Sequence, residues 1–153
     1  MRAWASRVLI PGVFVLLVSA LIIALWVIPA VRADASPQAM PGRAVPPLWA
    51  AVLITTLMAG TGLVALGGRA APTRLRRVAG AIAGAVAALL GLALVDAAAA
   101  FAGHEPPLRG AVVGLWVCVV CNLLGGAALL VAAARSRGRP AGPGVTAPTT
   151  GGG

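Results

Sequence analysis

The sequence has no lysine and no tyrosine, and its 153 residues include only three acidic residues, two cysteines and one histidine. Two cysteines cannot form the disulfide framework of a small secreted protein. A single histidine without spaced second ligands does not support a metal site, and we expect neither metal nor cofactor. His104 and Glu105, in AGHEPPLRG, are expected to lie in a solvated loop. Nucleotide-binding glycine loops, hydrolase elbows and zinc-protease motifs are also absent.

The basic residues are twelve arginines, and the formal net charge is +9. A basic chain can bind nucleic acid. Here, however, the arginines flank apolar segments and do not cluster on a domain, so we expect no nucleic-acid partner. The richness in arginine, alanine, glycine and proline indicates a GC-rich genome, and we expect a bacterial protein.

Hydrophobic residues make up 60% of the chain and charged residues 10%, a balance typical of membrane proteins. A helix needs about 20 apolar residues to cross a hydrocarbon core of ~30 Å. Four segments meet this length: residues 8–28, 48–66, 78–102 and 108–134. The sequence therefore predicts an all-α integral membrane bundle of four transmembrane helices over residues 1–134. The Gly/Pro/Thr-rich residues 135–153 are expected to form a disordered tail.

The arginines predict the orientation, because cytoplasmic loops of membrane proteins carry an excess of Lys and Arg. Nine of the arginines lie before the first segment, between the second and third, or after the fourth. The other side carries Arg32, Arg43 and Arg109, together with Asp34 and Glu105. We therefore expect both termini on the cytoplasmic side of a plasma membrane, with the lipid bilayer as the first partner.

Residues 1–35 also resemble a secretory signal, with Ala33-Asp34-Ala35 as a cleavage site. The apolar run of the first segment exceeds the 7–15 residues usual for a signal core, which favours an uncleaved first span.

Small residues mark where transmembrane helices approach closely. In the third segment, Gly80 and Gly84 form a G-x-x-x-G pair that continues to Gly91. In the fourth, a stripe of small residues spans nearly the whole helix: Gly110, Gly114, Cys118, then Cys121 or Asn122, and Gly125. We expect the third and fourth helices to pack along these two stripes.

Three polar residues stand inside or beside the apolar segments. With a turn around residues 102–107, Asp96 lies level with Arg109, and we expect a structural ion pair between them. The alternative is a transport site at Asp96, because intramembrane acids are functional-site candidates. Small multidrug exporters are also four-span proteins, but they carry a glutamate in the first span, and this chain has none there. Asn122 is expected to form a hydrogen bond across helices, with Thr61 its match in depth.

Cys118 and Cys121 form a C-x-x-C motif, and at i and i+3 they share a helix face, as a redox pair requires. A membrane bundle with this motif in its fourth span resembles the vitamin K epoxide reductase family. The resemblance implies electron transfer between thiols and a quinone at the outer side of the membrane. The family also uses a second cysteine pair in an outer loop, which this chain lacks. The alternative is that both cysteines pack as small hydrophobic side chains.

These observations predict a small multi-pass membrane protein that is not an enzyme. It is expected to act through helix–helix contacts, either as a homo-oligomer or with a membrane protein partner. The alternatives are a thiol–quinone oxidoreductase that uses Cys118 and Cys121, and a small transporter with Asp96 as its coupling site.

Overall fold

Long α-helices account for most of the chain in a computed structural model that describes residues 2–34, 43–67, 73–103 and 108–135. The elements in chain order are α1 (Arg2–Ile22), the π-helix η1 (Ile23–Val27), α2 (Ile28–Asp34), α4 (Val45–Gly67), α5 (Thr73–Ala102) and α6 (Arg109–Arg135). No strand occurs in these ranges. Four helices are long and apolar enough to cross a membrane, at 7–33, 45–65, 74–102 and 109–135. The predicted all-α chain with four such helices is confirmed, and these helices indicate a membrane protein.

The first helix continues through Pro29, where the sequence predicted its end. Proline lacks an N–H, and its ring collides with the carbonyl four residues earlier in a regular α-helix. The wider π-turn of η1 lies directly before this position, and the N–H of Ile28 donates to the carbonyl of Ile23. A local π-turn of this kind is one of the adjustments by which transmembrane helices tolerate a proline. As a result, α1, η1 and α2 form one helical span.

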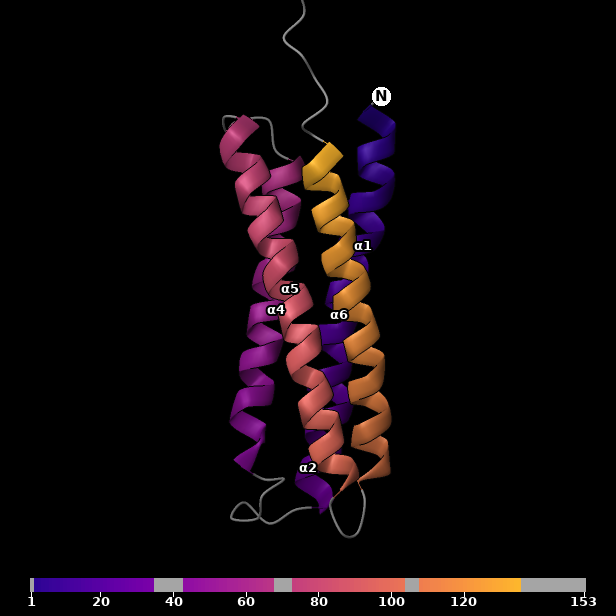
Figure 1. The fold of residues 1–153 in the computed structure, drawn as a ribbon. Coiled ribbons are helices and arrows are strands. Elements are labelled where there is room, and N and C mark those ends of the chain that lie inside the picture. The colour runs from indigo at the N-terminus through magenta and orange to yellow at the C-terminus, as the bar shows by residue number, and fades with distance from the viewer. Residues whose placement is uncertain (1, 35–42, 68–72, 104–107, 136–153) are drawn as a thin grey trace, which may run out of the picture.

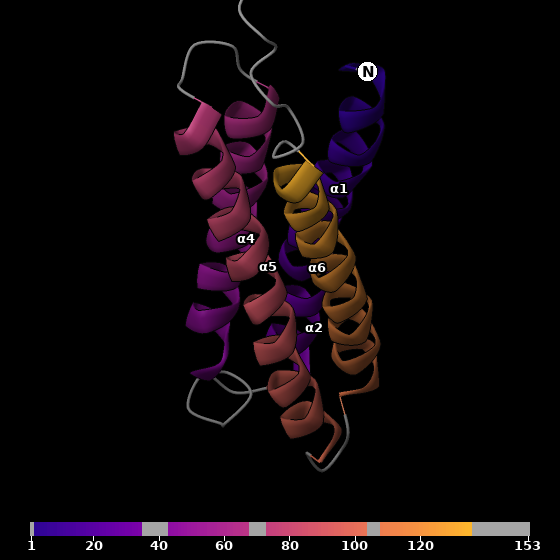
Figure 2. The same cartoon turned by 45° about the horizontal axis from the view of Figure 1, so that its top comes forward.

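The helices form an up-and-down bundle (Figure 1). Around the bundle, α6 packs against α5 and α1, and α4 packs against α1 and α5. The pairs α4–α6 and α1–α5 lie across the two diagonals. The N-terminal part of α1, the C-terminal end of α4 and the C-terminal end of α6 lie at one end of the bundle. The view in Figure 2 keeps the same arrangement, with α2, the C-terminal end of α5 and the N-terminal end of α6 at the other end.

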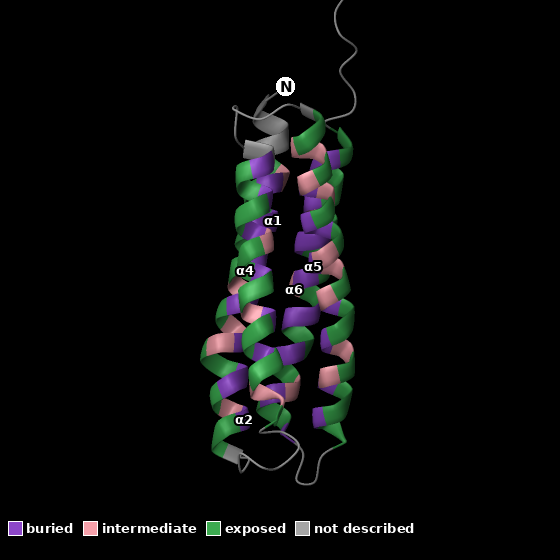
Figure 3. Cartoon of the chain, turned by 90° about the vertical axis from the view of Figure 1, so that its left-hand side faces the viewer, coloured by how far each residue is buried: buried purple, intermediate pink, exposed green. Residues whose placement is uncertain are grey.

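Two apolar clusters fill the interior, and the buried residues follow the inner faces of the helices (Figure 3). One cluster, near α2, includes Ile23, Leu94 and Leu115. The other, toward the N-terminus of the chain, includes Leu16 and Leu129. Between the clusters lie Ser19, Thr55 and Asn122, which are the buried polar residues of the described chain and are each 0% exposed. We call these three residues the polar layer.

Candidate functional site

Asn122 lies at the centre of the polar layer. Its Nδ2 donates to the hydroxyl of Ser19 on α1 at 2.7 Å, and to the carbonyl of Cys118 in its own helix at 2.9 Å. Its Oδ1 accepts from the hydroxyl of Thr55 on α4 at 3.4 Å. Its Cβ lies 3.2 Å from the place that a Cβ on Gly91 of α5 would occupy. This one side chain on α6 is therefore hydrogen-bonded to α1 and α4 and lies close to α5.

The layer lies near the middle of the bundle, because Thr55 and Asn122 fall midway along the candidate spans 45–65 and 109–135. Where no water is available, polar groups must pair with one another. Each hydrogen bond between transmembrane helices contributes about 0.6 to 2 kcal/mol. The Thr55 bond is notable because α4 and α6 otherwise make few contacts across the bundle.

The sequence predicted a hydrogen bond from Asn122 to another helix but not its partners. The partner on α4 is Thr55 and not Thr61, which is exposed. The partner at the shortest distance, Ser19 on α1, was missed. Ser19 is the only serine within the apolar part of the first segment, and that isolation was the one available signal.

The two cysteines differ in environment, and both are free thiols. Cys118 is 0% exposed, and its thiol donates to the backbone carbonyl of Ser19 at 3.6 Å. Cys121 is half-buried on the adjacent part of α6. Cys118 thus borders the polar layer and packs in the apolar cluster that contains Ile23. No group of three metal-ligating side chains occurs in the described part of the chain.

Glycine backbones bring α5 and α6 into contact. A Cβ on Gly84 would lie 2.8 Å from the carbonyl oxygen of Gly126, and a Cβ on Gly126 would lie 2.7 Å from the carbonyl oxygen of Gly84. Further along, a Cβ on Gly91 would lie 3.3 Å from the carbonyl oxygen of Val119. Gly80 is also buried on α5. The glycines of α5 therefore contact α6 as predicted. Their main contact on α6, however, is Gly126, which is not part of the predicted α6 stripe.

The predicted stripe on α6 instead faces the first helix. A Cβ on Gly114 would lie 2.8 Å from Val27, and one on Gly125 would lie 2.6 Å from Leu16. Gly110 is exposed, and its carbonyl accepts a 3.2 Å hydrogen bond from the indole of Trp26. Gly114 and Gly125 of the stripe therefore pack on the first helix and not on the third as expected, whereas Asn122 lies beside both Ser19 of the first helix and Gly91 of the third. Gly125 and Gly126 are one residue apart, so they point about 100° apart around a helix with 3.6 residues per turn, toward α1 and α5 respectively.

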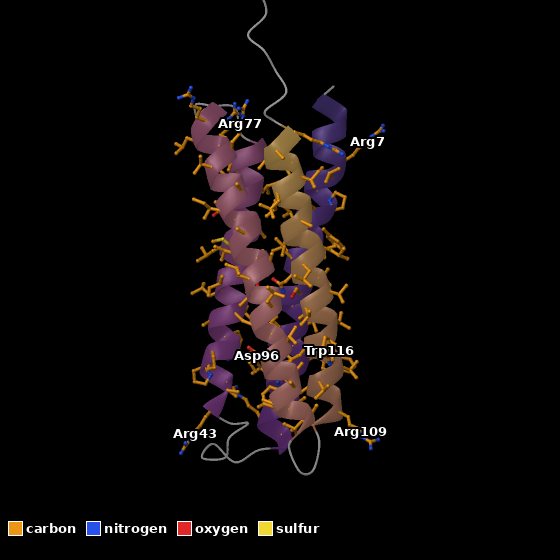
Figure 4. The ribbon with its side chains drawn as sticks, in the orientation of Figure 1. Arg7, Arg43, Arg77, Asp96, Arg109 and Trp116 are labelled. Atoms are coloured by element: carbon orange, nitrogen blue, oxygen red, sulfur yellow. The ribbon has the colours of Figure 1, made fainter. Side chains whose placement is uncertain are left out.

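Asp96 and Arg109 do not form the expected ion pair. Both are exposed, and neither has a hydrogen-bond or ion-pair partner among the described residues. Figure 4 places Arg109 at the end of the bundle, pointing away from it, and Asp96 higher along α5. The reason is the register of the two helices, which is given by the contacts of Gly91.

In that register, Gly91 lies level with the stretch from Val119 to Leu123. Asp96 lies five residues after Gly91 on α5, and Trp116 lies five residues before the middle of that stretch on α6. Because the two helices are antiparallel, Asp96 and Trp116 are level with each other. Arg109 is seven residues beyond Trp116, which corresponds to about 10 Å at 1.5 Å per residue. Trp116 is 47% exposed, and its indole also has no hydrogen-bond partner among the described residues. Figure 4 shows both Asp96 and Trp116 in the same part of the bundle.

The molecule thus has two polar features of different kinds. The interior one is a closed set of neutral groups, with no acid or base beside the hydroxyls. The exterior feature consists of the Asp96 carboxyl on α5 and the Trp116 indole on α6. The two groups lie at one level of the bundle, and neither has a hydrogen-bond partner among the described residues. Comparison with protein-family models, curated proteins and solved structures finds no match.

Proposed function

We propose that this chain is a multi-pass protein of a bacterial plasma membrane that acts, without catalysis, through lateral contacts between its helices and those of another membrane protein molecule. Both termini lie on the cytoplasmic side in this proposal. The arginine distribution supports that orientation, with Arg7 and Arg77 at one end of the bundle and Arg43 and Arg109 at the other (Figure 4). In the sequence, nine of the twelve arginines precede the first segment, follow the fourth, or lie between the second and third, as expected of a cytoplasmic side.

The observation that carries the proposal is the position of Asp96. It lies within the candidate span 74–102, on the outer surface of α5, without a partner in the described part of the chain. A carboxyl at a lipid-facing position is costly, and such residues almost always face a protein interior or pair with another group. Contact with a second protein molecule at this surface removes the cost.

The surroundings of Asp96 fit such a contact. One turn before and one turn after it on the same surface stand Ala93, Ala99 and Ala100, all of which are exposed. Small side chains allow the backbones of two transmembrane helices to approach closely, which is how helices associate in lipid. The α5 surface therefore combines a polar group that needs a partner with room for a helix beside it.

The two alternatives have less support. A thiol–quinone reaction requires an accessible thiol, whereas Cys118 is 0% exposed and is bound to the carbonyl of Ser19. A transport site requires a coupling carboxyl within the bundle or on a polar path, whereas Asp96 lies on the outer surface.

Site-specific photo-crosslinking in the native membrane tests the proposal. A photoreactive amino acid replaces Leu92, which is 55% exposed and one turn from Asp96, or Leu57, which is 55% exposed on α4. We expect a protein adduct from position 92 and only lipid adducts from position 57. Lipid adducts alone at both positions contradict the proposal.

A further inference from the structure

One side of the bundle is formed by the outer surfaces of α5 and α6. We call it the α5–α6 face, and its residues are Leu89, Leu92, Asp96, Trp116, Val120 and Leu123. All six are exposed. On α6, Leu123 borders α5 beside Gly91, and Val120 and Trp116 continue from it at helical spacing. On α5, Leu89, Leu92 and Asp96 follow one another by three or four residues and form a second stripe beside the first.

The polar groups on this face are complementary. A carboxyl accepts hydrogen bonds in either protonation state, and an indole N–H only donates. Asp96 and Trp116 lie at the same level of neighbouring helices, yet they do not bond to each other in the described chain. The Asp96 carboxyl lacks a hydrogen-bond donor and the Trp116 indole lacks an acceptor, and each residue provides the group that the other lacks.

Symmetry determines what such a face can bind. Two copies in one membrane have the same orientation, so a two-fold axis relating them runs along the bundle. Such an axis places α5 of one copy opposite α6 of the other, and an isologous interface repeats every contact twice. Since Asp96 and Trp116 lie at one level, each comes opposite its complement in the other copy.

We propose that the α5–α6 face binds a second copy of this chain, with the carboxyl of Asp96 accepting a hydrogen bond from the indole of Trp116 in the other copy, and the reverse. This inference rests on the proposed lateral function and names its partner. Both hydrogen bonds form between groups that otherwise face lipid. Around them, the alanines beside Asp96 allow the helices to approach, and Leu92 lies opposite Val120.

Capture between two differently tagged copies expressed together tests the pairing. Trp116→Phe removes the N–H and keeps a ring, and Asp96→Leu removes the acceptor. Because two hydrogen bonds are lost in either variant, we expect capture to fall about ten-fold. Asp96→Asn keeps a carbonyl acceptor and should retain capture. The matched control is Trp49→Phe, on α4, where the tryptophan is 45% exposed. Equal capture in Trp116→Phe and the wild type overturns the inference.

Cysteine cross-linking tests the geometry without changing either polar group. In a Cys118→Ser, Cys121→Ser background, one copy carries Leu92→Cys and the other carries Val120→Cys, two positions that are level in the α5–α6 register. We expect a disulfide-linked dimer from this mixture and much less from Leu92→Cys alone. Predominant linkage between two Leu92→Cys copies overturns the arrangement of α5 opposite α6. Leu57→Cys on α4 is the control and should not cross-link.

The photo-crosslinking described above distinguishes a failure of the proposed lateral function from a failure of the second copy as the partner. An adduct at position 92 with the mass of two copies of this chain supports both the function and the inference. An adduct with a different protein, and no capture between tagged copies, overturns the second copy as partner and leaves the lateral function standing. Lipid adducts alone overturn both.

Discussion

The amide of Asn122 donates a 2.7 Å hydrogen bond to the hydroxyl of Ser19, which lies 103 residues earlier in the chain. Both side chains are fully buried at the middle of the bundle. Through this bond and the one from Thr55, the fourth helix is joined to the first and, across the diagonal, to the second. The small-residue stripes bring the helices close, and the polar layer then specifies which side chains meet.

Replacing Asn122 by leucine should destabilise the bundle without changing its topology. The variant loses the bonds to Ser19 and Thr55 and leaves both hydroxyls buried. We expect the free energy of unfolding to fall by about 1 to 3 kcal/mol, since interhelical hydrogen bonds contribute about 0.6 to 2 kcal/mol each. Thermal unfolding in detergent measures this.

Two controls accompany the Asn122 variant. Thr61→Val changes an exposed hydroxyl on the same helix as Thr55 and should leave the unfolding temperature unchanged. Adding Ser19→Ala to Asn122→Leu should cost less than the two single losses combined, because both remove the same bond. Additive losses show that the leucine acts through overpacking and count against the prediction.

Gly126→Ala should separate α5 from α6. The new Cβ would lie 2.7 Å from the carbonyl oxygen of Gly84, and a backbone atom cannot move aside without shifting its helix. Overpacking of this kind costs about 1 to 3 kcal/mol of unfolding free energy. The matched control is Gly60→Ala, where no atom lies within 4 Å of the added Cβ. There the gain in helix propensity predicts equal or higher stability, and an equal loss in both variants would refute the explanation.

The two cysteines should react at different rates. Cys118 is fully buried and Cys121 is half-buried, so a membrane-permeable maleimide should label Cys121 first in the folded protein. Mass spectrometry after timed alkylation in detergent measures both rates. The difference should disappear in denaturant. Faster labelling of Cys118 in the folded protein would contradict its burial and would revive the redox alternative.

The proposed orientation predicts where reporter enzymes are active. Alkaline phosphatase is active only after export, so a fusion placed after Gly103 should be active and one placed after Arg135 inactive. A fluorescent protein that matures only in the cytoplasm should give the reverse pattern. The opposite pattern for both reporters would place the arginine-rich end of the bundle outside.

The apolar runs, and the prolines and glycines that bound them, allowed the helices to be predicted. Most helix ends in the structure lie within a few residues of the predicted ones. The exceptions have local causes. Pro46 and Pro47 lie in the first turn of α4, where a missing N–H has no consequence, so the helix begins before them. Pro29 lies within the first helix because η1 accommodates it, and a π-turn has no sequence signature that distinguishes it from an α-turn.

The register between neighbouring helices and the sides on which they pack were harder to predict than the helices themselves. Placing Asp96 level with Arg109 assumed a turn centred between residues 102 and 103. The ends of α5 and α6 are close to the predicted ones, but Gly91 lies level with the stretch from Val119 to Leu123, so the centre lies near 106. This change moves Asp96 from the level of Arg109 to that of Trp116. It was also not possible to predict which side of α6 packs on which helix. Small residues occur on two sides of α6, and composition does not say which side packs on α1 and which on α5.

The position of Asn122 in the last helix also affects the order in which the bundle is completed. A membrane chain emerges from the ribosome with its N-terminal helices first. Until α6 arrives, Ser19 on α1 and Thr55 on α4 have no amide between them. Synthesis of the fourth helix therefore does more than extend the protein. It supplies the group that joins α1 and α4 through hydrogen bonds, and a chain that stops before residue 122 lacks that group.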